Sequence, residues 1–339
     1  MSEQLLSLDN LQEIIEKALI AHNTTSENAR SVSESLVMAE ADGQKGHGLS
    51  RLESYCSQVA TGKVNGSAKP QAYWAADAVS RIDADHGFAY PALFLAKQKL
   101  IEIANTFGLG VASVFNSHHC GVAGHHVEYL AREGFVAMLF ANTPKAIAPW
   151  GGSKPVFGTN PIAFAAPSKA IAKDPIVIDL SLSKVARGKI MYAKQKGEKI
   201  PENWALDLNG KPTTDPNEAL IGSMLPMGDA KGAALVVMVE ILTSALTGAN
   251  LSYKASSFFT AEGPSPDVGQ LLMAFSPDVI SGGKYTNNIE EIINVIQSQE
   301  NTRLPGERRF QQRRQAQRSG LNISTQQYNK LIELSKIKL

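Results

Sequence analysis

Apolar residues recur every three to four positions in several stretches of the chain, which is the spacing of one face of an α-helix. This pattern predicts helices over residues 8–21, from Thr25 or Ser26 to Ala41, over 52–60, from Pro91 to Phe107, and over 122–133, 233–247, 286–299 and 325–337. Short apolar runs bounded by Gly, Pro or Asn predict strands at Val111–Phe115, Phe135–Ala141, Ile162–Ala166, Ile176–Leu180 and Gln270–Phe275, and Pro70–Asp83 also alternates enough to be strand. Gly and Pro interrupt residues 195–230, which we predict to be loop.

Composition and charge narrow the class of protein without identifying it. The chain has 339 residues, of which 43% are hydrophobic and 19% charged, and its net charge is +1. These values are typical of a globular enzyme, and such a small net charge does not favour nucleic acid or an anionic membrane as partner. No apolar run approaches the roughly 20 residues that span a bilayer, and the N-terminus lacks the basic and apolar regions of a signal peptide. With only two cysteines, Cys56 and Cys120, the chain is predicted to be cytoplasmic.

His47 and Arg51 lie four residues apart in the segment Gly46-His47-Gly48-Leu49-Ser50-Arg51. They share a face if the segment is helical, although Gly46 and Gly48 favour a turn equally well. Histidine transfers protons near neutral pH, and arginine offers a planar fork to a carboxylate. The pair therefore suits an acid substrate, and the alternative is a surface histidine beside a structural ion pair.

Four of the seven histidines lie between Asn116 and His126, directly after an apolar strand. This segment favours a strand-to-helix turn whose backbone N–H groups approach a phosphate or a ribose. A polar turn with helix-capping side chains is the second interpretation. A zinc site on the cluster from His118 to His126, as in a metal-dependent hydrolase, is the third, because no recurrent metal-ligand spacing is present.

Three further features bear on a cofactor. Gly158-Thr159-Asn160-Pro161 is typical of a loop that lines a pocket, and the strand Ile176–Leu180 carries Asp179 near its end, where α/β enzymes bind ribose or orient a base. No G-x-G-x-x-G follows a strand, so a nicotinamide enzyme of this sequence would need a fold other than the Rossmann type. Six arginines gather in residues 303–318, either as a solvated face or as a phosphate contact.

These segments together resemble the type-2 malate/L-lactate dehydrogenase family. The likeness rests on G-H-G-L-S-R (46–51), N-S-H-H-C-G-V-A-G-H-H (116–126), A-P-W-G-G (148–152), F-G-T-N-P-I-A-F-A-A-P (157–167), V-I-D-L-S-L-S-K-V-A-R-G-K (177–189) and R-L-P-G-E-R (303–308). The histidine and P-W-G-G segments resemble the branch that reduces Δ1-piperideine-2-carboxylate and Δ1-pyrroline-2-carboxylate. Other branches act on 2-hydroxy acids such as malate, lactate or sulfolactate.

The resemblance implies an α/β fold with a mixed, largely antiparallel sheet wrapped by helices, distinct from the Rossmann type and usually found in a homodimer. Residues 1–115 and 300–339 would form the helical, substrate-side and dimerisation region. Residues 116–299 would bind NAD(P).

The resemblance also implies roles for individual residues. His47 would donate the proton, Arg51 would hold the substrate carboxylate and Thr159 would contact the substrate. Family members commonly carry Ser before the catalytic His, whereas this chain has Gly46, so Asp179 or a water would orient His47 instead. The expected cofactor contacts are His119, Cys120, Gly121, Val122, Ala123, Val177, Ile178, Asp179, Lys231, Gly232, Arg303, Leu304, Pro305, Gly306, Glu307 and Arg308.

The sequence thus predicts an NAD(P)H-dependent reductase of cyclic imino acids that forms L-pipecolate or L-proline. A 2-hydroxy-acid dehydrogenase of the same family is the alternative, and the metal-dependent hydrolase is a more distant one. We expect NADPH rather than NADH, because Arg303 or Arg308 could bind the extra phosphate, while Arg313, Arg314 and Arg318 would only solubilise a helix. No metal, nucleic acid or membrane partner is expected.

Overall fold

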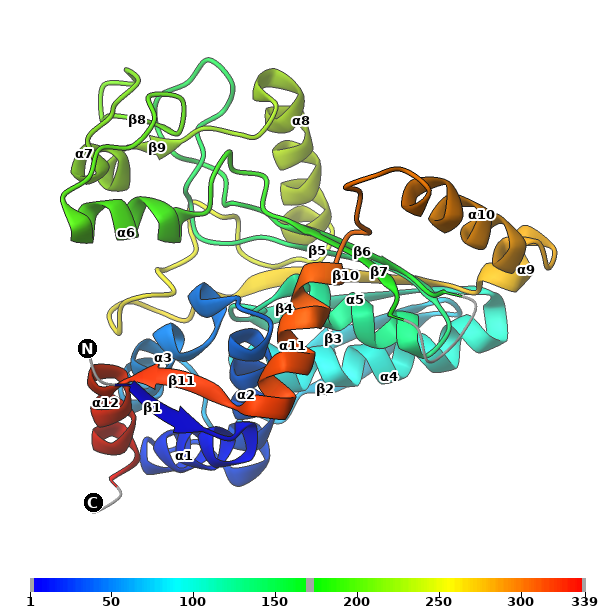
Figure 1. Ribbon diagram of the computed structural model, residues 1–339, viewed down its shortest axis with the longest axis horizontal. Coiled ribbons are helices and arrows are strands. Elements are labelled where there is room, and N and C mark those ends of the chain that lie inside the picture. Colours follow the sequence, from blue (N-terminus) through cyan, green and yellow to red (C-terminus); the bar gives the residue numbers. More distant parts are fainter. Residues whose placement is uncertain (1–2, 169–173, 337–339) are drawn as a thin grey trace.

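A seven-stranded sheet runs through the centre of the molecule (Figure 1). The computed structural model describes residues 3–168 and 174–336. The strands lie in the order β2 (Gln71–Ala76), β3 (Val79–Asp83), β4 (Leu109–Ser117), β10 (Val268–Phe275), β5 (Val136–Ala141), β6 (Ile162–Ala166) and β7 (Ile176–Leu180). Only β3 and β4 are parallel, and all the other neighbours are antiparallel. The predicted α/β class with a largely antiparallel sheet is confirmed.

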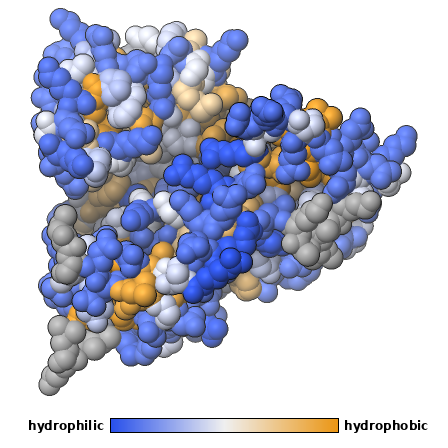
Figure 2. Space-filling model, in the orientation of Figure 1, coloured by the Kyte–Doolittle hydropathy of each residue, from blue (hydrophilic) through white to orange (hydrophobic). Residues whose placement is uncertain are grey.

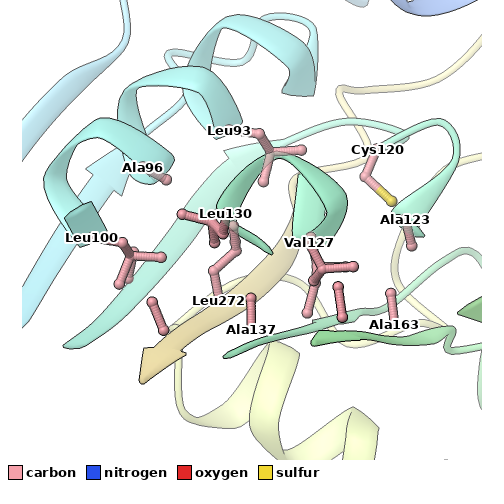
Figure 3. Packing of buried hydrophobic residues seen from close by; sticks show 14 of the residues in the cluster. Leu93, Ala96, Leu100, Cys120, Ala123, Val127, Leu130, Ala137, Ala163 and Leu272 are labelled. Atoms are coloured by element: carbon pink, nitrogen blue, oxygen red, sulfur yellow. The ribbon is translucent and has the colours of Figure 1, made fainter. Parts of the chain in front are cut away.

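Alternating side chains of the sheet enter two different cores, because successive strand residues point to opposite faces. In β10, Leu272 and Ala274 join the core beneath α4 (Ala89–Phe107) and α5 (Ala123–Arg132), as Figure 3 shows for Leu272. Leu271 belongs to the other core, under α6 (Arg187–Lys196), α8 (Asp229–Glu240) and the π-helical turn Ile241–Ala245. The central strand is therefore buried on both faces, which explains the unbroken apolar run Leu271–Phe275 at its end.

The N-terminal helices form a separate bundle beside the sheet. It contains α1 (Leu8–Ala21), α2 (Ser26–Ala41), α3 (Leu52–Ala60) and, from the other end of the chain, α12 (Thr325–Ser335). Strand β1 (Glu3–Leu6) pairs antiparallel with β11 (Leu321–Ser324) and brings the two ends of the chain together. Helix α11 (Glu307–Ser319) connects the sheet to this bundle (Figure 1). Near the β6 and β7 edge, α9 (Pro277–Ser281) precedes α10 (Tyr285–Gln297), whose Ile289 and Ile293 pack on Ile176.

Most of the predicted helices and strands are confirmed within a few residues, and residue 337 of the last helix lies outside the described residues. The stretch from Pro70 to Asp83 forms two strands rather than one. The prediction of loop over 195–230 was wrong in part, because α6 reaches Lys196, α7 spans Pro216–Ile221, and β8 (Ala205–Leu206) pairs with β9 (Ser223–Met224). Proline breaks a helix interior but favours its first turn, and Pro216 begins α7 behind the Asp215 N-cap.

No helix in residues 3–168 or 174–336 is both long enough and apolar enough to cross a membrane.

Candidate active site

His47 and Arg51 sit in two short 3-10 turns, Lys45–His47 and Leu49–Arg51, between α2 and α3. The buried carboxylate of Glu40 fixes this segment by accepting a hydrogen bond from the Leu49 N–H (2.7 Å). A Cβ atom at Gly48 would overlap that carboxylate, so the second glycine of the motif is required by packing. A Cβ at Gly46 would meet nothing within 4 Å, so the fold itself accepts a larger residue there.

The ring of His47 lies against His119. Nδ1 of His47 and Nε2 of His119 are 3.1 Å apart, and the two rings are nearly parallel, with centroids separated by 5.1 Å. The other nitrogen of His119 lies 2.7 Å from the Tyr55 hydroxyl, which in turn lies 3.1 Å from the hydroxyl of Tyr90. Four side chains from distant parts of the chain thus form a continuous hydrogen-bonded row that begins at His47.

Both histidines of this row are neutral at physiological pH. Burial lowers the pKa of His47 to about 3, and the positive charge of Arg51 lowers it further in the same direction. Burial also brings the pKa of His119 well below its usual value. At this pKa a neutral His47 binds a proton only weakly, but a carboxylate bound to Arg51 would offset the Arg51 charge and so raise the pKa of His47.

Arg51 keeps one donor available for a ligand. Its Nε donates to the carbonyl oxygen of Gly46 (2.7 Å), and the Phe259 ring lies 4.4 Å from the guanidinium carbon. Its Nη1 is buried without a hydrogen-bond partner. Leaving a buried donor unpaired is costly, so this nitrogen suits a carboxylate that enters the site.

The four clustered histidines point to four different partners. His118 contacts Gln58 Oε1 (2.7 Å), His125 contacts Asp42 (2.9 Å) and His126 contacts the carbonyl oxygen of Cys120 (2.8 Å), while His119 faces His47. Within the described ranges, no group of three or more His, Cys, Asp or Glu side chains could hold a metal ion.

Three of the segments assigned to the cofactor meet at the edge of the sheet. The Asp179 carboxylate in β7 accepts from the Gly124 N–H at the start of α5 (2.8 Å). The Val177 N–H in the same strand donates to the carbonyl of Pro305 (3.1 Å), and a Cβ at Gly306 would lie 3.2 Å from the Val177 oxygen. The segments 177–179 and 303–308 therefore meet each other, and Asp179 also contacts Gly124, directly after 119–123; that these segments bind the dinucleotide stays a prediction.

Asp179 and Thr159 do not reach His47 through a direct hydrogen bond in the described part of the chain. The side chain that contacts the His47 ring is His119. Thr159 instead pairs with Thr143. The Thr159 N–H donates to the Thr143 hydroxyl oxygen (2.9 Å), and the two hydroxyl oxygens lie 3.3 Å apart.

Lys231 and Gly232 lie in the first turn of α8, on the opposite face of the sheet from α5. A Cβ at Gly232 would overlap the carbonyl of Met227, so this glycine allows the chain to turn closely into the helix.

The arginines of residues 303–318 divide differently from the prediction. Arg303 and Arg308 are exposed beside the converging segments. Arg313 was predicted only to solubilise a helix, and this is wrong: it donates to Asp42 (2.6 Å) and to Glu128 (2.7 Å) from a largely buried position. Arg309, with its side chain only 8% exposed, pairs with the same Glu128 (2.6 Å).

The pKa values of this ion network follow from its geometry. Burial raises the pKa of Asp42, but hydrogen bonds from Arg313 and His125 outweigh that effect and hold it at about 2. The same competition lowers the pKa of Glu128. These acids stay ionised, so α11 is held by charge against α2 and α5.

The structure also tests whether the site could accept a dinucleotide. The Nε of Arg309 is buried without a hydrogen-bond partner, 3.8 Å from the Asp42 carboxylate, and a Cβ at Gly124 would meet both Arg309 and Asp179. A guanidinium nitrogen that has no hydrogen-bond partner, near a helix N-terminus, can donate to a phosphate. These residues fit the group that the resemblance implies.

The space-filling view shows the molecule hollowed between the block that carries α6, α7 and α8 and the block that carries α1 to α3 (Figure 2). The segment 250–267, yellow in Figure 1, runs between these two blocks. It contributes Phe258 and Phe259, which sequence reasoning missed together with Tyr55 and Tyr90. Aromatic residues in a loop or helix give no local sign of the histidine or arginine that they contact.

This arrangement of a mixed sheet and covering helices defines an α/β protein, and comparison with known proteins gives its class. The family model "Malate/L-lactate dehydrogenase" matches residues 6–332. The chain belongs to the malate/L-lactate dehydrogenase family, as its motifs predicted.

Individual relatives match along nearly the whole chain. The chain is 50% identical to "(2R)-3-sulfolactate dehydrogenase (NADP(+))" of Chromohalobacter salexigens, over 92% of each protein. It is 37% identical to "Delta(1)-pyrroline-2-carboxylate/Delta(1)-piperideine-2-carboxylate reductase" of Pseudomonas putida, over 96% of this chain and 95% of the relative. The solved Δ1-piperideine-2-carboxylate reductase of Pseudomonas syringae superposes with a TM-score of 0.92 at 35% identity, covering 98% and 99% of the two chains.

Proposed function

We propose that this protein transfers hydride between NADP(H) and carbon 2 of a small carboxylic acid, with a 2-hydroxy acid and the corresponding 2-oxo acid as its substrate pair. One observation carries the proposal: the buried, unpartnered Nη1 of Arg51 lies beside the neutral His47–His119 pair. A cation for the carboxylate and a base for the adjacent hydroxyl are the two groups that this reaction needs.

In the oxidation direction, Arg51 binds the carboxylate and orients carbon 2. His47 accepts the hydroxyl proton through the nitrogen that does not face His119, as the hydrogen on carbon 2 leaves with its electron pair and the C=O bond forms. The bound nicotinamide supplies the hydride acceptor. In the reverse direction, the same imidazole returns the proton to the oxygen.

Two substrate classes compete for this site. The relative that is 50% identical carries the name of a sulfolactate dehydrogenase, which favours a 2-hydroxy acid with a second anionic group. The cyclic imino acids predicted from the motifs are the second candidate, supported by the 37% identical reductase and by the 35% identical solved reductase. For an imine, His47 would keep the proton on the ring nitrogen, since a protonated imine is the better electrophile.

The proposed cofactor is NADPH or its oxidised form. The name of the 50% identical relative specifies NADP(+), and Arg303 and Arg308 lie exposed at the converging segments, where either could reach a 2′-phosphate. The homodimer, the cytoplasmic location and the division into residues 1–115 with 300–339 and 116–299 stay predictions.

A substrate screen with purified protein tests the proposal. NADPH formation would be followed with (2R)-3-sulfolactate, its enantiomer, malate and lactate, and NADPH loss with the 2-oxo acids and with both cyclic imines. We expect the highest kcat/KM with a 2-hydroxy acid that carries a second anionic group. We also expect loss of turnover in His47→Gln. Highest kcat/KM with a cyclic imine would establish the second candidate, and turnover of none of these acids would refute the proposal.

A further inference from the structure

The segment 257–262 is held in place by one buried lysine. Lys63 is only 3% exposed. Its ammonium donates to the carbonyl oxygens of Ser257 (2.7 Å), Thr260 (2.9 Å) and Glu262 (2.9 Å). All three hydrogens of the ammonium are therefore used on the backbone of a single short segment.

Two neighbours of Lys63 complete this attachment. Gln58 donates from Nε2 to the carbonyl of Phe258 (2.8 Å), and Thr61 donates from Oγ1 to the carbonyl of Ala261 (3.0 Å). Because 257–262 belongs to no helix or strand, its carbonyl groups need partners from elsewhere. Side chains from the end of α3 and the turn after it supply them.

The attached segment places two aromatic rings on the active site. The ring of Phe258 lies 5.0 Å from that of His118 and 5.3 Å from that of His119. Phe259 lies 4.4 Å from the guanidinium carbon of Arg51. Phe259 covers one face of the guanidinium and the Gly46 carbonyl accepts from its Nε, which leaves Nη1 as a donor without a partner for a carboxylate.

We propose that Lys63 is a positioning residue for substrate binding, which acts by holding Phe259 against Arg51, and that Phe259 helps to determine which carboxylic acids bind. This inference rests on the proposed function, because it assigns the carboxylate to Arg51. Lys63 touches neither the substrate nor the reacting atoms. Its loss should therefore weaken the binding of the acid, while hydride transfer from a bound substrate continues.

A kinetic cycle tests the proposal with the acid that the wild-type protein turns over best. Lys63→Met should raise KM for the acid about tenfold, the factor that about 1.4 kcal/mol of lost binding produces, with kcat and the KM for NADP(H) little changed. Phe259→Leu should raise the same KM. If Lys63 acts through Phe259, the double variant should be no worse than the more affected single variant, because the two changes remove one interaction.

The matched control is the second buried lysine. Lys97→Met removes an ammonium that lies 4.2 Å from the Tyr129 ring, on α4 and away from the segment 257–262. It should leave KM for the acid unchanged. Wild-type KM in Lys63→Met, or effects of Lys63→Met and Phe259→Leu that multiply in the double variant, would overturn the proposal.

Hydrogen–deuterium exchange provides a readout that needs no substrate. Backbone amides of 257–262 should exchange faster in Lys63→Met and, to a smaller extent, in Thr61→Val. Thr61→Val replaces Lys63→Met in this experiment if Lys63→Met does not fold. Unchanged exchange in Thr61→Val together with wild-type KM would count against the proposal. If the wild-type protein turned over none of the acids, the proposed function would fail, whereas the exchange experiment would still decide whether Lys63 holds this segment.

Discussion

Replacing Asp42 with asparagine should destabilise the protein by removing the central charge of the network around α11. The Asp42 side chain is fully buried and accepts hydrogen bonds from Nε and Nη2 of Arg313 at 2.6 and 2.7 Å. His125 lies 2.9 Å away on the same carboxylate. Asparagine has nearly the same shape, so the change removes the charge and one acceptor and leaves the packing intact.

The magnitude follows from the pKa of Asp42, which falls from 3.8 to about 2 on folding. A shift of this size corresponds to roughly 2 kcal/mol of stabilisation of the ionised form. Breaking a buried pair from one side costs about 3–5 kcal/mol in other proteins, because the remaining charge loses its partner. Glu128 still pairs with Arg313 in the variant, so we expect a loss of about 2–4 kcal/mol in the free energy of unfolding.

The effect should depend on pH in a defined direction. A carboxyl group whose pKa is lowered on folding stabilises the protein fully above its unfolded pKa of 3.8, and this contribution disappears as pH falls toward the folded pKa of about 2. The difference between wild type and Asp42→Asn should therefore be constant from pH 7 to 5 and fall to roughly half by pH 3.

Urea unfolding or calorimetry of both proteins across this pH range measures the difference. The control is Asp174→Asn, because Asp174 makes more exposed ion pairs with Arg314 and Arg132, and such pairs contribute at most about 1 kcal/mol. Wild-type stability in Asp42→Asn at pH 7, or a deficit that does not shrink toward pH 3, would refute the reasoning.

Four further outcomes are expected. His47→Ala should lower kcat by roughly 10² or more, the usual effect of losing a positioned proton-transfer group, and near-normal kcat would contradict the role of His47. Arg51→Ala should raise KM for the acid and leave the Kd of NADPH, measured by fluorescence titration, nearly unchanged. Replacing Arg303 and Arg308 with alanine should weaken NADPH binding about tenfold to a hundredfold and spare NADH, whereas equal losses would place both arginines on the shared part of the dinucleotide. Prolonged EDTA treatment should leave activity intact, and stoichiometric zinc with loss of activity on chelation would favour the hydrolase.

Local patterns were sufficient to predict most of the secondary structure. Leu11, Ile15 and Leu19 recur at helical spacing because one face of α1 is buried, and the ends of β6 and β7 coincide with the predicted ones. Strand β1 was missed because it is short and exposed, and it pairs with a segment more than 300 residues away. Pairing of that kind leaves no periodic signal in either segment.

The candidate site was predictable where a local motif carries it. His47 and Arg51 could be selected because a proton-transferring side chain and a carboxylate-binding one lie four residues apart in a segment that resembles the family's. The partners of these residues were not predictable. Nothing in the sequence around Lys63 distinguishes it from a surface lysine, and its three carbonyl acceptors lie nearly 200 residues later in the sequence.

Strand β10 lies between β4 and β5 in the sheet, although about 130 residues separate it from β5 in the sequence. During synthesis, the strands made before it can form only two partial sheets, β2–β3–β4 and β5–β6–β7, each with an open apolar edge. The ribosome must reach Phe275 before the two halves can join, so folding should be slow and the unfinished chain prone to aggregate. Expression of this protein should therefore respond strongly to lower temperature or added chaperones, and any truncation before β10 should be insoluble.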